Sequence, residues 1–507
     1  MSKVIGPKQA VEKIKDGSTV AVGGFVGIGH PEEITRAIEE QFLAGEKPQN
    51  LTIVYAAGQG DGKDRGINHL AHKGLVKRVI GGHWGLAPKM VKLAIENSIE
   101  AYNFPQGVIT HLYRDIAAKK PGTITHVGKG TFVDPEISGG KINSRTKEDL
   151  VSNISIDGAR WLYYRAFPVD VGLIRGTSAD TDGNISFEKE CGSLEMLAIA
   201  QAAANSGGIV IAQVEKLVKR HTLNPWMVKV PGIIVDYVVV AKKENHWQTF
   251  SQEYNPSLSG EIKTPGDAIP KMAADERKII CTRALQEIKE NDVVNLGIVL
   301  PEGISMVANE KGVFGRMNLT VEAGIIGGIP AGGLSFGASF NPACIINQPS
   351  QFDFYDGGGL DIAFLGMAQA DFMGNVNVSK FGNKLAGCGG FIDITQNTKR
   401  VVFCGTLTSG GLKVSYGNKK LKIISEGVHR KFINEVEQIT FSGSYAREKN
   451  HEILYITERC VFKLCMGGIM LTEIAPGINL EKDILSNMDF KPEISRQLKI
   501  MDGGIFS

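Results

Sequence analysis

The chain has 507 residues, a hydrophobic fraction of 43% and a formal net charge of +2, from 56 basic and 54 acidic side chains. This length exceeds what one hydrophobic core supports, so we expect at least two domains. The near balance of charge excludes the basic field of a nucleic-acid-binding protein. No run of about 18 apolar residues predicts a membrane span, and the first residues lack the apolar core of a signal peptide, so we expect a cytoplasmic protein.

The predicted elements alternate between strands and helices. Short apolar runs, typical of strands buried on both faces of a parallel sheet, occur at residues 52–56, 169–174, 209–214 and 233–241. Helical patterns occupy residues 31–43, which open with a proline, and residues 193 to about 205, with Ser193 as the expected cap. The fold class is therefore α/β, with mainly parallel sheets.

The second half of the chain repeats motifs of the first half in the same order. DVGLIRGTSADTDGN, from Asp170, matches DIAFLGMAQADFMGN, from Asp361, and the spacing of Gly27-Ile28-x-x-Pro31 recurs in Gly297-Ile298-x-x-Pro301. We interpret this as a duplication, giving two homologous open α/β domains, the second about 80 residues shorter between the motifs. The alternative is that strand ends of α/β proteins resemble one another. The polar stretch 251–275 is the expected linker, which predicts domains at residues 1–260 and 261–507.

Three segments have the composition of a reactive site. The first is the turn from Val22 to Pro31, whose glycines would let backbone amides bind an anion ahead of a helix, or would only make a tight connection. It has no Walker lysine and no G-x-G-x-x-G spacing, which disfavours nucleotide hydrolysis and nicotinamide binding. The second is Glu322, at the end of an apolar strand and followed by glycines, where a solvated or capping role is the alternative. The third is the glycine turn Gly387–Gly390, whose amides could polarise a carbonyl.

These segments together resemble the family I CoA transferases. Residues 16–31, DGSTVAVGGFVGIGHP, are similar to the first signature of that family, and Val321–Gly324 resembles the segment with its glutamate nucleophile. Gly387–Gly390 resembles its later glycine motif, and similarity to bacterial single-chain acetate or propionate CoA-transferases covers nearly the whole chain, most clearly LSFGASFNP, QFDFYDGGGLDIAFLG and GNVNVSKFG.

The resemblance implies a fold of the NagB/RpiA/CoA transferase type and a role for each matching residue. Glu322 would be the nucleophile that carries CoA as a thioester, and Gln106 would form the oxyanion hole with a backbone amide of Gly389 or Gly390. The residues implied to contact CoA are Gly297, Ile298, Val299, Leu300, Pro301, Gly389 and Gly390. Those expected at the oxyanion or acyl pocket are Gly23, Gly24 and Phe25, with Gln59, Met196 and Ala338 as further acyl-pocket candidates.

The sequence departs from the family at two places. Val299 stands where relatives often have glycine, which weakens Val299 as a direct CoA contact, and Val321 and Ala323 flank Glu322 where succinate-specific relatives have serine and asparagine. The succinyl-using branch is therefore disfavoured.

The resemblance also implies the partners of the reaction. We expect CoA as a substrate and no permanently bound cofactor, short carboxylic acids such as acetate, propionate, butyrate, lactate or acetoacetate, and a homodimer or homotetramer. Ten scattered histidines form no HxxxH or similar set, so no metal is expected. Two alternatives stay open, an acyl-CoA hydrolase that uses the same glutamate and a non-catalytic protein that binds acyl-CoA or a phosphosugar.

Overall fold

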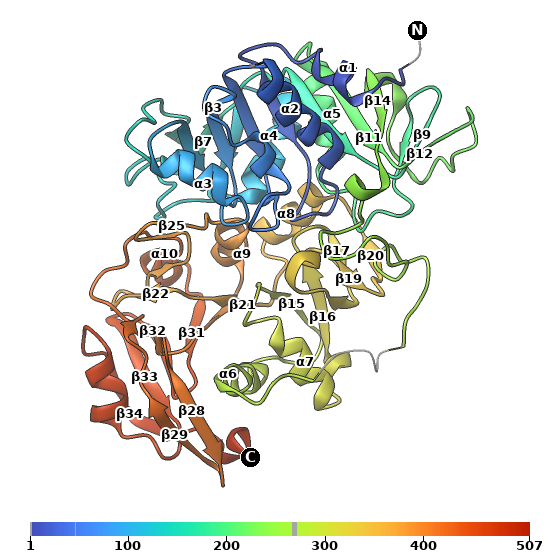
Figure 1. Ribbon diagram of the computed structural model, residues 1–507. Helices are drawn as coiled ribbons and strands as arrows, with labels where there is room; N and C mark the ends of the chain where they lie inside the picture. The colour runs from blue at the N-terminus through green and yellow to red at the C-terminus, as the bar shows by residue number, and fades with distance from the viewer. Residues whose placement is uncertain (1–2, 46, 266–270) are drawn as a thin grey trace. The chain divides into compact units, whose positions relative to one another are not determined.

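A computed structural model describes residues 3–45, 47–265 and 271–507 (Figure 1). Its described residues fall into two compact units. Unit 1 comprises Met1–Thr264, Val321–Asp353 and Asn383–Asp393, and unit 2 comprises Pro265–Thr320, Phe354–Gly382 and Ile394–Ser507. The segment with Glu322 thus packs within unit 1. Packing units need not coincide with duplicated copies of a domain, so the division into residues 1–260 and 261–507 stays a prediction.

Unit 1 is built on a seven-stranded sheet of order β14-β11-β8-β1-β2-β3-β4, in which every neighbouring pair is parallel. The strands are β1 (Thr19–Val22), β2 (Leu51–Tyr55), β3 (Val76–Gly81), β4 (Glu100–Asn103), β8 (Val171–Arg175), β11 (Ile209–Val214) and β14 (Tyr237–Val240). All five residues of β8 are buried, as expected for a strand covered on both faces.

The two helices predicted in unit 1 are present, with a shifted start for one of them and for one predicted strand. The helices of unit 1 are α1 (Pro7–Val11), α2 (Glu32–Gly45), α3 (Pro88–Ile95), α4 (Gln106–Ala117) and α5 (Met196–Asn205), with the first parts of α8 (Gln348–Asp356) and α9 (Phe391–Asn397). The prediction that Ser193 caps a helix was wrong, because α5 begins at Met196 with Glu195 at its cap position. The strand expected from residue 233 begins at Tyr237, because Gly232–Ile234 forms a 3-10 turn.

Small sheets complete unit 1 around this framework. One contains β5 (Gly122–Thr125), β6 (Val151–Ile156) and β7 (Ala159–Arg165), and another contains β9 (Ser178–Asp180), β10 (Ile185–Ser186), β12 (Lys216–Val218) and β13 (Val228–Val230). Two antiparallel pairs follow Glu322 in the chain. They join β17 (Ile325–Ile326) to β20 (Cys344–Ile345) and β18 (Ile329–Pro330) to β19 (Ser339–Phe340).

Unit 2 is built on strands in the order β16-β15-β21-β26-β31-β32-β33-β34, of which the first five are parallel (Figure 1). They are β15 (Asp292–Leu296), β16 (Met317–Val321), β21 (Ile362–Gly366), β26 (Arg400–Cys404), β31 (Glu452–Ile456), β32 (Cys460–Cys465), β33 (Gly468–Ile474) and β34 (Glu493–Ile500). Its helices include α6 (Glu276–Leu285), α7 (Gly303–Glu310) and α10 (Gly443–Glu448). A hairpin of β28 (Lys413–Gly417) and β29 (Lys420–Ser425) is added to it.

The strand order of the two units agrees with the duplication predicted from the repeated motifs. The series β14-β11-β8-β1-β2 in unit 1 corresponds to β31-β26-β21-β15-β16 in unit 2. Asp170 accepts a hydrogen bond from the Thr19 amide at 2.8 Å, and Asp361 accepts one from the Val293 amide at 3.0 Å. The first copy continues beyond β2 with β3 and β4, which accounts for part of its greater length.

Among the described residues, no helix has both the length and the apolarity needed to cross a membrane. The seven cysteines are free, and five of them are buried.

Candidate active site

The carboxyl ends of the parallel strands of unit 1 place the predicted glycine turns at one edge of the sheet, where α/β proteins bind ligands. After β1, the amide of Gly23 donates to the Leu173 carbonyl at 3.0 Å, and that of Gly24 donates to the Glu195 side chain at 3.2 Å. The Phe25 amide donates to the Ile28 carbonyl at 2.8 Å. These amides hold the turn in its shape here, and the assignment of Gly23, Gly24 and Phe25 to the acyl pocket stays a prediction.

Behind this turn lies a histidine that the sequence did not single out. The His30 ring contacts the Gln59 side-chain oxygen at 2.7 Å through Nδ1 and the Thr35 hydroxyl at 3.0 Å through Nε2, while Gln59 donates to the Val22 carbonyl at 2.8 Å. Burial lowers the pKa of His30 to about 4, so the ring is neutral near pH 7. Gln59, expected at the acyl pocket, therefore also fixes the end of β1.

A second histidine lies between two glutamates of α2. His69 Nε2 is 2.9 Å from Glu32 and its Nδ1 is 2.5 Å from Glu39. Burial alone would lower the pKa of His69, but the hydrogen bonds to both glutamates outweigh this effect and raise it to about 9. The sequence offered only the seven-residue spacing of the two glutamates, which places them on one face of a helix.

The structure brings together two predicted motifs that are far apart in the chain, those of Gln106 and of the Gly387–Gly390 turn. The Gln106 amide donates to the Gly389 carbonyl at 2.9 Å, and the Gly389 amide donates to the Gly82 carbonyl at 2.8 Å. Gln106 is 2% exposed, and its side-chain Nε2 has no hydrogen-bond partner among the described residues. A buried amide donor without a partner is costly, which indicates that a ligand or water oxygen completes it.

Glu322 follows β16 and is buried, with 8% of its surface exposed. The backbone turns sharply behind it, because Gly324 has φ +103° and accepts from the Ile346 amide at 2.8 Å, while its own amide donates to the Val321 carbonyl at 2.9 Å. The positive φ is the reason a glycine is needed here. The nucleophile expected from the sequence thus lies in unit 1, as do Gln106 and the Gly387–Gly390 turn.

The loop expected to contact CoA, Gly297–Pro301, belongs to unit 2. Val299 has φ +71°, and Gly29, at the corresponding position of the first copy, has φ +66°. A β-branched residue in this region is strained, so valine here occupies a backbone shape that suits glycine. Val299 is 61% exposed, and its carbonyl accepts from Arg277 at 3.3 Å.

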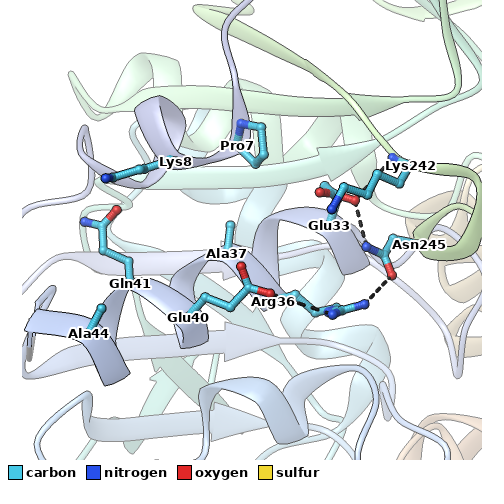
Figure 2. A pocket seen from close by; sticks show the side chains of 10 residues that line it. All are labelled: Pro7, Lys8, Glu33, Arg36, Ala37, Glu40, Gln41, Ala44, Lys242 and Asn245. Carbon is cyan, nitrogen blue, oxygen red and sulfur yellow. Dashed lines mark hydrogen bonds and ion pairs between the residues drawn. The ribbon is translucent and has the colours of Figure 1, made fainter.

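A separate cavity of about 320 Å³ lies between α1, α2 and the loop at Lys242 (Figure 2). The predicted site residues are not among those that line it, and Asn245 joins the side chains of Arg36 and Glu33 within it. Arg36 donates to Asn245 at 2.9 Å, and Asn245 donates to Glu33 at 2.7 Å. We therefore place the site at the glycine turns and not here. Among the described residues, no three His, Cys, Asp or Glu side chains are arranged so that they could hold a metal ion.

Comparison with known proteins identifies the family of the chain. A family model described as coenzyme A transferase matches residues 5–241, and relatives with CoA-transferase names match the chain over nearly its full length. The chain belongs to the coenzyme A transferase family and is a CoA-transferase.

Two relatives and one solved structure illustrate the similarity. The caffeate CoA-transferase of Acetobacterium woodii is 48% identical over 100% of this chain and 98% of its own length. The acetate CoA-transferase YdiF of Escherichia coli K12 is 45% identical over 99% of this chain and 95% of its own. The crystal structure of the acyl-CoA transferase YdiF from E. coli O157:H7, described as a thioester complex with CoA, has a TM-score of 0.95 and 44% identity, covering 100% of this chain and 96% of that one.

Proposed function

We propose that this enzyme moves CoA between a short-chain acyl-CoA and a free carboxylate by a ping-pong mechanism, through a glutamyl-CoA thioester on Glu322. The observation that carries the proposal is the buried Nε2 of Gln106, a donor without a partner that is fixed beside the Gly387–Gly390 turn. Such a donor is what a developing oxyanion requires. The description of the E. coli structure as a CoA thioester complex supports the same chemistry.

In the first half-reaction, the Glu322 carboxylate attacks the thioester carbonyl, and the tetrahedral intermediate expels CoA as a thiolate, which leaves a mixed anhydride of the acyl group and Glu322. The thiolate then attacks the glutamyl carbonyl, which releases the first acid as a carboxylate and leaves CoA on Glu322. A second carboxylate attacks the glutamyl thioester and expels the thiolate, which then attacks the new acyl carbonyl. The products are the new acyl-CoA and the free Glu322 carboxylate.

Each tetrahedral intermediate needs preset donors for its oxyanion. Gln106 Nε2 supplies one of them in this proposal. The Gly389 amide donates to the Gly82 carbonyl, whereas no hydrogen bond of the Gly390 amide is found among the described residues. We therefore assign the second donor to Gly390. Removing one such donor typically costs roughly 3 kcal/mol of barrier.

The proposal is tested by replacing Glu322 and by finding CoA on it. Glu322→Gln should abolish transfer, and mass spectrometry of the parent enzyme mixed with acyl-CoA should locate a CoA or borohydride-reduced adduct on Glu322. Glu12→Gln, at an exposed position, is the control and should keep parental activity. Parental turnover in the Glu322→Gln enzyme would refute the mechanism.

Incubation with acetyl-CoA, with and without an acceptor acid, distinguishes a transferase from a hydrolase that uses the same glutamate. Without an acceptor acid, a transferase releases at most one equivalent of acetate per site and no free thiol, because CoA stays on Glu322, whereas a hydrolase releases acetate and free CoA thiol continuously. The non-catalytic alternative predicts binding of acyl-CoA with no exchange at all.

The acid substrate is proposed as a short-chain one, with acetate and propionate first. The two relatives carry the names of different acids, caffeate and acetate. The acceptor panel should therefore contain acetate, propionate, butyrate, lactate, acetoacetate and caffeate with one acyl-CoA donor. We further propose a cytoplasmic homodimer or homotetramer without a permanently bound cofactor. Light scattering after size-exclusion chromatography tests the subunit number, and mass spectrometry of the undigested enzyme tests for a bound group.

A further inference from the structure

Asn103, the last residue of β4, lies at the centre of the contacts around the Gly387–Gly390 turn. Its side chain is buried, with 1% of the residue exposed. The side-chain amide donates to the carbonyls of Gly81 at 2.8 Å and Gly82 at 2.5 Å, and its oxygen accepts from the Cys388 amide at 2.9 Å. The Asn103 side chain therefore joins the end of β3 to the Gly387–Gly390 turn, in which Cys388 is 285 positions beyond Asn103.

These three hydrogen bonds are part of a network that connects the end of β3, the segment from Asn103 to Gln106 and the Gly387–Gly390 turn. The Gly82 carbonyl that receives the Asn103 amide also receives the Gly389 amide at 2.8 Å, and the Gly389 carbonyl receives the amide of Gln106 at 2.9 Å. Gln106 is three residues beyond Asn103. The backbone around Gly389 is thus fixed on both sides to the segment that begins with Asn103 and ends with Gln106.

The chemistry of the position requires an amide. Two carbonyl oxygens face the Asn103 nitrogen and one N–H faces its oxygen, so the residue must donate twice and accept once. An aspartate has the same shape but only accepts when ionised, and it would face the Gly81 and Gly82 carbonyls without a donor. The buried mismatch would push the end of β3 away from the Gly387–Gly390 turn.

We propose that Asn103 is a positioning residue for CoA transfer, which holds the Gly390 amide and the Gln106 side chain in the arrangement that receives the oxyanion. This inference rests on the proposed function. Oxyanion donors act only when they are preset, and a displacement of about 1 Å can cost about 100-fold in rate. Asn103 itself has its polar atoms occupied by protein groups, so it acts through the two donors and not on substrate.

A matched control separates positioning from ordinary stability. Asn68 is 0% exposed and has the same bonding pattern, since it donates to the Arg65 carbonyl at 2.9 Å and the Leu86 carbonyl at 3.2 Å and accepts from the Lys89 amide at 3.2 Å. The residues it joins are not among the predicted site residues. Asn68→Asp should therefore lower the melting temperature about as much as Asn103→Asp, and should leave kcat within about threefold of the parent.

The test compares Asn103→Asp and Asn68→Asp in melting temperature, in kcat and KM for acyl-CoA, and in the single-turnover rate of the CoA adduct on Glu322. We expect Asn103→Asp to lower kcat and the adduct rate roughly 100-fold, with KM for acyl-CoA within about threefold of the parent. If either aspartate variant fails to fold, the serine variants Asn103→Ser and Asn68→Ser give the same comparison. Asn103→Ser should then lower kcat, by less than Asn103→Asp would, whereas Asn68→Ser should not lower it.

Two results would overturn the inference. One is that Asn103→Asp forms the CoA adduct on Glu322 at the same rate as the parent; where the serine pair is used, the same holds for Asn103→Ser. The other is an equal fall of kcat in the Asn68 partner of the pair. If the parent itself forms no CoA adduct on Glu322, the proposed function fails instead, so the two failures are distinguishable.

Discussion

The carboxyl group of Glu195 should make the stability of unit 1 fall as the pH rises. Glu195 is 1% exposed, one of its oxygens accepts from the Gly24 amide at 3.2 Å, and the other has no hydrogen-bond partner among the described residues. Burial raises the pKa of Glu195 from 4.5 to about 7, against a smaller lowering by backbone amides that include that of Gly24. Replacing Glu195 by glutamine removes this titration while keeping the shape of the side chain.

The magnitude and sign follow from the difference between the two states. In the unfolded chain the group ionises near pH 4.5, whereas in the folded chain it holds its proton until about pH 7. The folded state therefore binds more protons between these values, and the free energy of unfolding falls as the pH rises through them. At about 1.36 kcal/mol per pKa unit, the full cost is about 3 kcal/mol above pH 7. Glu195→Gln should thus be more stable than the parent by up to that amount at pH 8 and of similar stability at pH 4.5 or below.

Urea unfolding followed by tryptophan fluorescence measures this difference, because all four tryptophans, Trp84, Trp161, Trp226 and Trp247, lie in unit 1. Other buried groups titrate equally in both proteins and cancel in the comparison. Glu12→Gln, at an exposed position, is the control and should show no such pH dependence. A stability difference between Glu195→Gln and the parent that is the same at pH 4.5 and pH 8 would refute the reasoning.

Three further changes have defined outcomes. The hydrogen bonds of His69 to its flanking glutamates outweigh the effect of burial and raise its pKa to about 9. The protonated ring therefore stabilises the folded state fully below pH 6.5, and this contribution is lost as the pH rises through 9. His69→Gln should remove this part of the pH dependence of the urea midpoint of unfolding. A methyl group at Gly23 would collide with the Met196 side chain, so Gly23→Ala should cost about 1–3 kcal/mol in urea unfolding, whereas Gly45→Ala, which meets open space, should cost nothing. Val299→Gly should relieve about 1–2 kcal/mol of backbone strain at this positive φ. The amide hydrogens of the Gly297–Pro301 loop should then exchange more slowly than in the parent, and an unchanged exchange rate would contradict the presence of strain.

The parallel strands and the duplication could be predicted because they leave local signals. Buried parallel strands are short apolar runs, and the equivalent roles of Asp170 and Asp361 appear as a repeated aspartate at the start of a repeated motif. The element boundaries were less certain. Nothing in the sequence near Ser193 shows that Glu195, buried under the glycine turn, takes the cap position of α5 instead.

The local sequence was enough to single out Glu322 and the Gly387–Gly390 turn as candidates, whereas their roles, and Gln106 itself, came from the resemblance to a family. Asn103, His30 and His69 were not predicted, because their roles depend on contacts that form only in the folded chain. A buried asparagine and a surface asparagine look alike in a sequence. The signal that distinguishes Asn103 is the distance to Cys388, which exists only once the chain is folded.

The parallel strands β3 and β4, which extend the first copy beyond β2, bear on the number of CoA groups held by each chain. β4 leads to Asn103 and Gln106, and β3 ends at the Gly81 and Gly82 carbonyls, so every contact that holds the proposed oxyanion donors arises from the extension beyond β2 or binds to it. Duplication of the five-stranded core alone would therefore not duplicate the proposed reactive centre. A calorimetric or mass-spectrometric titration should saturate at one covalently held CoA for each polypeptide.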